Sequence, residues 1–148
     1  GAVGVLSRNV RAVFAANQGR HALPRELELL AEFASPGEQA LLDMFRQVDH
    51  MACRLHTART LARMQSEEAA EPIAQLLRQT IQAGPDNEKL VPSASSESRE
   101  ETYVRTCASL IESLQILDPA QAKQAAEAVI RDGPGSLRAA CLRIWAGE

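Results

Sequence analysis

Aromatic side chains are scarce in this sequence, and their scarcity narrows the choice of fold. Phe, Trp and Tyr together make up 3% of the 148 residues, whereas alanine and leucine are abundant. Such a composition favours closely packed helices over a β-sandwich. A chain of this length is large enough for one domain with a core of its own. We therefore predict a single helical domain that spans residues 1–148.

Positive charge is also sparse. The formal net charge is −3, and the chain contains only two lysines, Lys89 and Lys123, with its arginines scattered along the sequence. A domain dedicated to DNA or RNA is usually basic and carries a clear Lys/Arg face. The charge therefore argues against nucleic acid as the partner.

Paired cysteines and long apolar runs are absent. Cys53, Cys107 and Cys141 are widely spaced, odd in number and form no C-x-x-C pair. Each falls on a predicted apolar helix face, where a free thiol behaves as a small hydrophobic residue. We interpret them as reduced and structural, which favours the cytoplasm. No apolar run of 18 residues occurs and no signal peptide opens the sequence, so we expect no membrane span and no membrane partner.

The stretch Thr57–Leu77 is the clearest organised feature that is present. Its apolar residues recur at i, i+3 and i+4, which predicts two short amphipathic helices. Ser66 between them offers a side-chain oxygen to cap the second helix, and Gly84–Pro85 ends it. Two helices joined by so few residues are expected to pack antiparallel. The stripes are Ala58, Leu61 and Ala62 in the first helix and Ile73, Leu76, Leu77 and Ile81 in the second.

Three helices are predicted before this stretch. The first runs over Arg8–Asn17 and the second begins at Pro24, a favourable first helical residue. Ser35–Glu38 is a capping box, S-x-x-E, with proline after the cap. The helix behind it is expected to break near Val48–Asp49, because an unbroken helix to the next proline would be unusually long. Asp49 could then cap the helix that follows.

The segment Gly84–Glu101 differs from its surroundings. It is polar, rich in serine and contains two prolines, so it lacks the apolar area that ordering requires. We predict a mobile Ser-rich loop at 84–101, with helix resuming at Thr102. The loop is either a tolerated insertion or a regulated, partner-binding segment.

A second helical hairpin follows this loop. Asp118–Pro119 reads as an N-cap with proline at the first helical position. Asp132–Gly135 ends that helix, and Ser136 caps a last one. Trp145, the sole tryptophan, either fills the core under the last helix or marks a contact with a missing unit or another copy. The two stripes are Val104, Cys107, Ala108, Ile111 and Leu114, then Ala122, Ala125, Ala126, Val129 and Ile130.

The two hairpins and the last helix share one pattern, which is typical of a helical repeat. The pattern resembles the HEAT-repeat family, especially its short bacterial form, over residues 54–83 and 102–147. It departs from that family in the long loop at 84–101, in Ala62 and Ser113 where a glycine is expected, and in a third unit of one helix. The matching residues are Ala58, Leu61, Met64, Glu68, Ala69, Pro72 and Ile73, then Ala108, Ile111, Leu114, Asp118 and Pro119, then Leu137, Ala139, Ala140 and Leu142.

The resemblance implies an all-α fold of antiparallel hairpins stacked as a short α-solenoid, with an irregular helical bundle as the alternative. It also implies a non-enzymatic scaffold that binds another protein, with possible contacts to further repeats of a longer parent chain. The second helices would line the binding face. On repeat geometry, the residues expected to bind the partner are Gln75, Arg78, Gln79, Lys123 and Glu127.

One cluster could carry chemistry instead. Asp49, His50, Cys53 and His56 have helical spacings that bring some of their side chains together, and Zn²⁺ accepts such donors. However, His50 and His56 point away from each other on a helix, so the four cannot converge. A Cys–His nucleophile would lack a third residue to orient it. We therefore assign no catalytic, cofactor or metal residue, and keep a small-molecule- or metal-binding regulatory domain as the alternative function.

Overall fold

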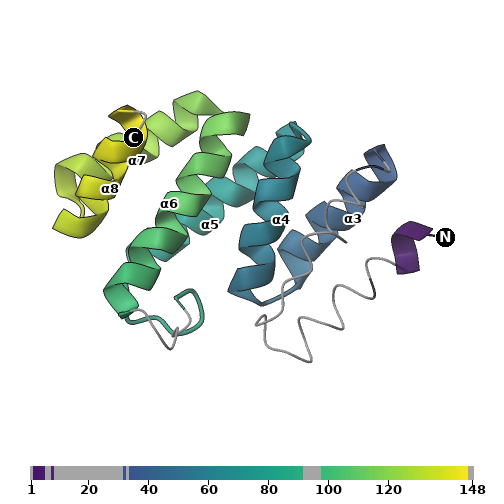
Figure 1. Ribbon diagram of the computed structural model, residues 1–148, viewed down its shortest axis with the longest axis horizontal. Helices are drawn as coiled ribbons and strands as arrows, with labels where there is room; N and C mark the ends of the chain where they lie inside the picture. Colours follow the sequence, from purple (N-terminus) through teal and green to yellow (C-terminus); the bar gives the residue numbers. More distant parts are fainter. Residues whose placement is uncertain (1, 6–7, 9–31, 33, 92–97, 147–148) are drawn as a thin grey trace. The chain divides into compact units, whose positions relative to one another are not determined.

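The computed structural model describes residues 2–5, 8, 32, 34–91 and 98–146, and these form helices and connecting turns without any strand (Figure 1). The fold is all-α, as predicted. The predicted helices at 8–17 and from Pro24 fall almost entirely outside the described residues. The elements are α3 (Ala34–Gln47), α4 (Met51–Arg63), the short 3₁₀ helix η1 (Glu67–Ala69), α5 (Ala70–Ala83), α6 (Arg99–Leu117), α7 (Pro119–Asp132) and α8 (Gly135–Ala146).

The chain divides into two compact units, Gly1–Ala69 and Ala70–Glu148. The boundary falls inside the predicted hairpin Thr57–Leu77, so the pairing of its two helices stays a prediction, as does the single domain. None of the described helices combines the length and the apolar character that crossing a membrane requires.

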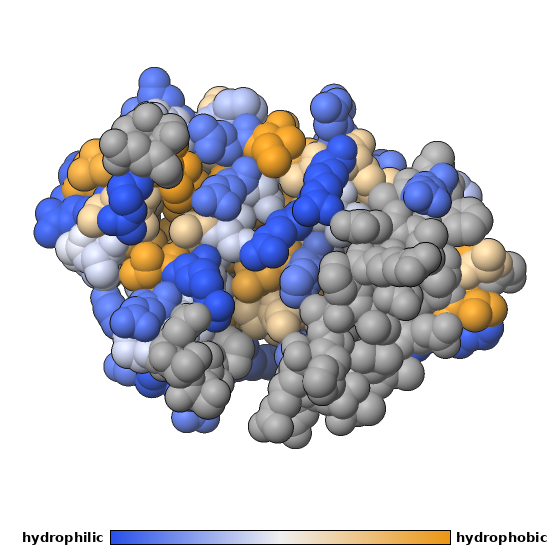
Figure 2. All heavy atoms as spheres, viewed as in Figure 1, coloured by the Kyte–Doolittle hydropathy of each residue, from blue (hydrophilic) through white to orange (hydrophobic). Residues whose placement is uncertain are grey.

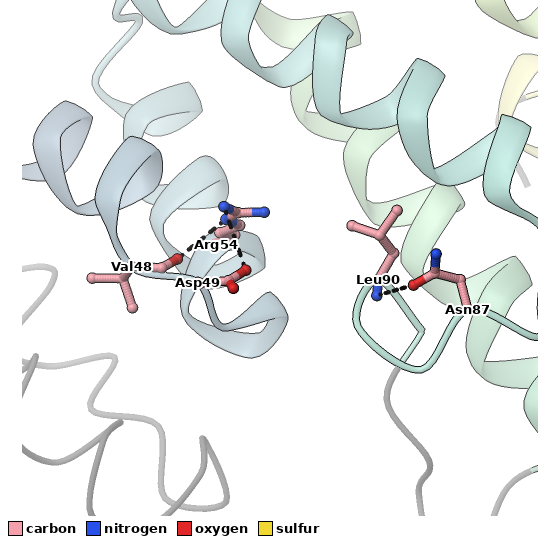
Figure 3. A network of polar contacts seen from close by, with 5 residues as sticks. All are labelled: Val48, Asp49, Arg54, Asn87 and Leu90. Carbon is pink, nitrogen blue, oxygen red and sulfur yellow. Dashed lines mark hydrogen bonds and ion pairs between the residues drawn. The ribbon is translucent and has the colours of Figure 1, made fainter.

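In the first unit, α3 packs against α4. The predicted break at Val48–Asp49 is confirmed, and the side chain of Arg54 stabilises the connection between the two helices. The Arg54 Nε donates to the carbonyl oxygen of Val48 at 3.2 Å, and its guanidinium lies 3.8 Å from the Asp49 carboxylate (Figure 3). Asp49 therefore fixes the connection rather than capping α4, whose N-cap position is occupied by His50.

The turn after α4 is also built differently from the prediction. Gln65 adopts a positive φ of 57°, and the Ser66 hydroxyl donates to the Glu38 carboxylate of α3 at 2.7 Å instead of capping the next helix. That bond ties the turn to α3 within the unit. α3 itself begins at Ala34, one residue before the expected cap Ser35.

In the second unit, α6 packs against α5, α7 and α8. Asp118 alone joins α6 to α7, and Gly133–Pro134 joins α7 to α8, so consecutive helices reverse direction (Figure 1). As a result α5 lies beside α7, and α6 lies beside α8. The predicted Asp118 cap is confirmed, because its carboxylate accepts from the Gln121 backbone N–H at 3.2 Å.

Most residues of the predicted apolar stripes are buried in the core of this unit, while Ile81, Val104, Ala108, Ala125 and Ile130 are only half-buried. Buried members include Ile73, Leu76 and Leu77 of α5, Cys107, Ile111 and Leu114 of α6, and Ala122, Ala126 and Val129 of α7. The sequence left open whether Trp145 fills the core under α8 or marks a contact surface, and its side chain is 39% exposed.

The described parts of the loop at 84–101 are held by side chains. Gly84 ends α5 with a φ of 77°, a conformation that glycine adopts without strain. The Asn87 Oδ1 accepts from the backbone N–H group of Lys89 at 3.1 Å. It also accepts from the backbone N–H group of Leu90 at 3.1 Å (Figure 3). Residues 92–97 lie outside the described part, and the predicted mobility stays a prediction.

α6 begins at Arg99, earlier than the predicted Thr102, because Ser98 caps it. The Ser98 hydroxyl accepts from the Glu101 backbone N–H at 3.1 Å. The Arg99 guanidinium then donates to the carbonyl oxygens of Pro85 at 3.0 Å and Val91 at 3.1 Å. The helix start thereby fixes the turn that leads into the loop.

Candidate functional site

The candidate site is a groove between α5 and α7 in the second unit, which we call the α5–α7 groove. Its volume is about 420 Å³ and most of its surface is apolar. Both walls belong to helices that the sequence assigns to the second position of a hairpin. The lining residues are Ala74, Leu77, Arg78, Ile81 and Gln82 of α5, Leu114 of α6, and Gln121, Gln124, Ala125, Ala128, Val129, Asp132 and Gly133 of α7 and its end.

The groove exists because α7 presents alanine where larger side chains would fill the space. Ala125 is half-buried and Ala128 is exposed, and both line the hollow. Under them, Leu77, Leu114 and Val129 are almost fully buried and form an apolar floor. Alanine is also the best helix former, so α7 keeps its helix while leaving the space open.

The rim of the α5–α7 groove is polar, and its charged residues are paired with residues of opposite charge. Gln82, Gln121 and Gln124 contribute amides. The two charged rim residues already have partners on their own helices, since Arg78 pairs with Glu71 and Asp132 pairs with Arg131, each at 2.9 Å. These pairs are exposed and contribute at most about 1 kcal/mol each.

Asp118 organises the start of α7 and one rim residue. The Gln121 side chain donates to its carboxylate at 2.9 Å, in addition to the backbone bond that caps the helix. These bonds, led by the one from the Gln121 side chain, lower the pKa of Asp118 from its usual value. The carboxylate consequently stays ionised and holds the Gln121 amide at the rim.

Of the five residues predicted to bind a partner, Arg78 lines the groove. Gln75, Gln79, Lys123 and Glu127 are exposed on other faces of α5 and α7. Lys123 and Glu127 lie 4.0 Å apart, one helical turn from each other on α7. Binding by these five residues stays a prediction.

Sequence reasoning missed the residues that shape the groove, above all Gln82, Gln124, Ala125 and Ala128. Ala125 was expected to be part of the buried return stripe of α7. The available signal was the alanine content of α7, because four alanines between positions 122 and 128 leave little side-chain volume on two of its faces. Only the pairing of α7 with α5 reveals which of those faces is hollow.

A second hollow, the α6–α8 groove, has a volume of about 530 Å³ and a different chemistry. The Ser136 hydroxyl and the Glu100 carboxylate bond across one end of it. Figure 2, viewed as Figure 1 is, shows hydrophobic atoms interleaved with hydrophilic ones over α6 and α8. Its apolar lining is Val104, Ala108, Ala139, Ala140 and Ile144, and its polar lining is Glu100, Glu101, Arg105, Glu112, Ser136 and Arg143.

The interior between α6 and α8 holds two thiols. All three cysteines of the chain are buried, as predicted, and none of them forms a disulfide. Burial, reinforced by the neighbouring Cys141, raises the pKa of Cys107 to about 12, and burial also raises the pKa of Cys141. Burial likewise raises the pKa of Tyr103 to about 12, and its hydroxyl donates to the carbonyl oxygen of Ile81 at 3.2 Å. These groups are protonated at neutral pH, so neither thiol is a ready nucleophile.

The cluster Asp49, His50, Cys53 and His56 lies in the first unit. The buried Cys53 thiol contacts the Thr57 hydroxyl at 3.8 Å, and Asp49 faces Arg54. Desolvation, with a smaller effect of Arg59, lowers the pKa of His56. Across the described residues, no three His, Cys, Asp or Glu side chains are grouped so that they could hold a metal ion.

Comparisons with protein-family models, with curated proteins and with solved structures find no match to this chain.

Proposed function

We propose that this protein is a non-enzymatic interaction module that binds another protein through the α5–α7 groove. The observation that carries the proposal is the groove itself, which combines an apolar floor, a wall that carries alanine in place of larger side chains, and a rim of amides. A surface of this kind suits the apolar side chains of an amphipathic helix, which enter a groove at spacings of i, i+3, i+4 and i+7.

The energetics favour an apolar ligand segment. Each aliphatic side chain that moves from water into such a groove contributes about 1.5–3 kcal/mol when it is fully buried. The rim amides of Gln82, Gln121 and Gln124 both donate and accept hydrogen bonds. Because the charged rim residues are already paired, the partner segment needs uncharged polar flanks rather than a charged face.

The HEAT-like repeat pattern supports the same proposal. The groove is walled by α5 and α7, the helices that the resemblance assigns to the binding face. In this proposal the hairpins stack as a short solenoid, and further repeats of a longer parent chain could extend it. Three reduced cysteines favour a cytoplasmic setting.

A peptide selection tests the proposal. A displayed library of 16-residue helical peptides, with about four randomised apolar positions, is selected on the full chain and counter-selected on Ala128→Arg, which fills the groove from an exposed position. We expect enriched peptides to share an apolar i, i+3/4, i+7 pattern and to lose at least about tenfold in affinity for Ala128→Arg.

The matched control lies on the same helix. The double variant Lys123→Ala/Glu127→Ala changes the opposite side of α7, and we expect it to bind the selected peptides as the parent chain does. Two results would show that the peptides bind outside the groove. One is equal affinity for the parent chain and Ala128→Arg, and the other is a loss of affinity confined to the double variant. No enrichment at all would contradict the proposal.

The volume and apolar floor of the groove also fit a second function, the binding of a small apolar molecule by a regulatory domain. Sites for such ligands typically have volumes of about 300–1,000 Å³, and this groove has about 420 Å³. A thermal-shift screen of apolar compounds on the parent chain and Ala128→Arg distinguishes the two functions. Stabilisation by a compound in the parent only, together with a failed peptide selection, would favour the small molecule.

A further inference from the structure

The two walls of the α5–α7 groove run in the same direction. The Tyr103 hydroxyl, near the start of α6, donates to the carbonyl oxygen of Ile81 near the end of α5, so α6 begins where α5 ends. Asp118 alone then joins α6 to α7, which reverses the chain a second time (Figure 1). α5 and α7 are therefore parallel to each other. α6 lies antiparallel beneath both of them, with its Leu114 at the floor of the groove.

The groove consequently has two ends of different chemistry. One end lies where both walls finish, because Gln82 belongs to the last turn of α5, and Asp132 and Gly133 end α7. The other end lies toward the starts of the walls, at Ala74 and Gln121. The carbonyl ends of two parallel helices carry partial negative charge, and their N–H ends carry partial positive charge. The groove is therefore more negative at its Asp132 end.

The Asp132 carboxylate strengthens this asymmetry and has room for a further hydrogen bond. It is the only acidic group among the described residues that line the groove. Its Oδ2 accepts from the Arg131 Nε at 2.9 Å, but a carboxylate offers two oxygens and about four acceptor positions. The first turn of any helix has backbone N–H groups without a partner in that helix, and a carboxylate suits them. The Asp132 end therefore fits the start of a bound helix.

We propose that the α5–α7 groove binds its partner helix in one direction only, antiparallel to α5 and α7, with the first turn of the partner against the Asp132 carboxylate. The partner then lies on the two walls as α6 does from beneath. This direction rests on the proposed function, because it concerns the same groove and the same partner. It adds that the partner segment begins its helix at Gln82 and Gly133, and that Asp132 selects the direction.

Paramagnetic relaxation tests the direction. The probe is a peptide enriched in the selection on the full chain, with a nitroxide on a cysteine added at its N-terminus in one sample and at its C-terminus in another. A helix of about 16 residues is about 24 Å long, so the two labels mark different ends. Each peptide is titrated into the full ¹⁵N-labelled chain. We expect the N-terminal label to broaden the amide resonances of Gln82 and Gly133 most, and the C-terminal label those of Ala74 and Gln121.

Substitutions separate the carboxylate of Asp132 from its ion pair. Asp132→Ala removes both, and we expect the peptide to bind about three- to tenfold more weakly, as the loss of a helix cap predicts. Asp132→Asn keeps an oxygen that can cap a helix and should restore most of the affinity. Arg131→Ala is the matched control, because it breaks the same exposed pair but keeps the carboxylate, and we expect a change of less than about twofold.

The outcomes distinguish the direction from groove binding itself. A peptide that shifts the resonances of Ala125 and Ala128 but gives the reverse broadening pattern, or equal broadening of both ends by each label, overturns the direction and leaves groove binding intact. So does an affinity that is unchanged in Asp132→Ala or that falls equally in Arg131→Ala. A selection on the full chain without any enriched peptide overturns groove binding and the direction together.

Discussion

The α5–α7 and α6–α8 grooves are built alike, yet they differ in what they can bind. Each lies between two neighbouring helices of the second unit, and the helices of each pair are separated in sequence by one antiparallel helix. Alanines and glutamines line the first, while five charged residues and the Ser136–Glu100 bond surround the second. The arrangement of helices creates both hollows, and the side chains decide which of them can hold apolar residues.

The burial of the residues at the floor of each groove gives the first test of this comparison. Leu114, at the floor of the α5–α7 groove, is 1% exposed, whereas Val104 of the α6–α8 groove is half-buried. We expect Leu114→Ala to lower the free energy of unfolding by about 2–5 kcal/mol, and Val104→Ala to lower it by about 1 kcal/mol or less. Urea denaturation measures both, and equal losses would show that the two floors belong equally to the core.

Alkaline pH should destabilise the fold through the buried thiols, which lie on the α6–α8 side and not on the α5–α7 side. The pKa of Cys107 is about 12 in the folded chain against 9.0 for the ordinary group, so the unfolded state loses this proton first. The stabilisation is complete below about pH 9 and is lost as the pH rises from 9 toward 12. We expect the free energy of unfolding of Cys107→Ala to fall less steeply over that range than that of the parent chain. Parallel curves from urea titrations would contradict this origin of the pKa.

The bond between Ser136 and Glu100 gives a smaller effect. Ser136→Ala and Glu100→Gln, alone and combined, form a double-mutant cycle across the α6–α8 groove. Because both residues are exposed, we expect a coupling free energy of about 0.5–1 kcal/mol in favour of the pair. The exposed pair Lys123 and Glu127 of α7 is the reference, with an expected coupling of about 0.3–0.5 kcal/mol. A zero coupling for Ser136 and Glu100 would show that the bond does not join the helices in solution.

Salt should have the smallest effect, and it separates the two grooves by charge. A peptide held in the α5–α7 groove meets amides and pre-paired charges, so we expect its dissociation constant to change less than about threefold between about 50 and 500 mM salt. A ligand held by the charged α6–α8 groove would weaken much more over that range. A steep salt dependence of the selected peptides would therefore assign them to the α6–α8 side.

Local sequence signals predicted much of the fold. The caps and breaks that depend on neighbouring residues were found, including Asp118 before α7, Gly84 after α5 and the break at Val48–Asp49. Errors arose where a side chain bonds to a distant residue. Ser66 and Ser136 were both expected to cap helices, but their hydroxyls bond to Glu38 and Glu100.

The site was less accessible to sequence reasoning. The helices that form the walls of the α5–α7 groove were predicted. Arg78, which was predicted to bind a partner, lines the groove, and its binding role stays a prediction. Ala125 and Ala128 could not be recognised as part of a groove wall, because a small side chain leaves a hollow only where the neighbouring helix does not fill the space beside it. The sequence could not decide between the two interpretations of Trp145 for a related reason, since an apolar stripe has the same spacing whether or not another helix covers it.

Mapping a selected peptide onto the ¹⁵N-labelled chain tests the central claim most directly. If the α5–α7 groove binds the partner, the amide resonances that shift most upon titration will be those of Ile81, Ala125 and Ala128, while those of Gln79 and Lys123 stay nearly unchanged. Shifts centred on Gln79 and Lys123, or confined to the residues of the α6–α8 groove, would contradict it.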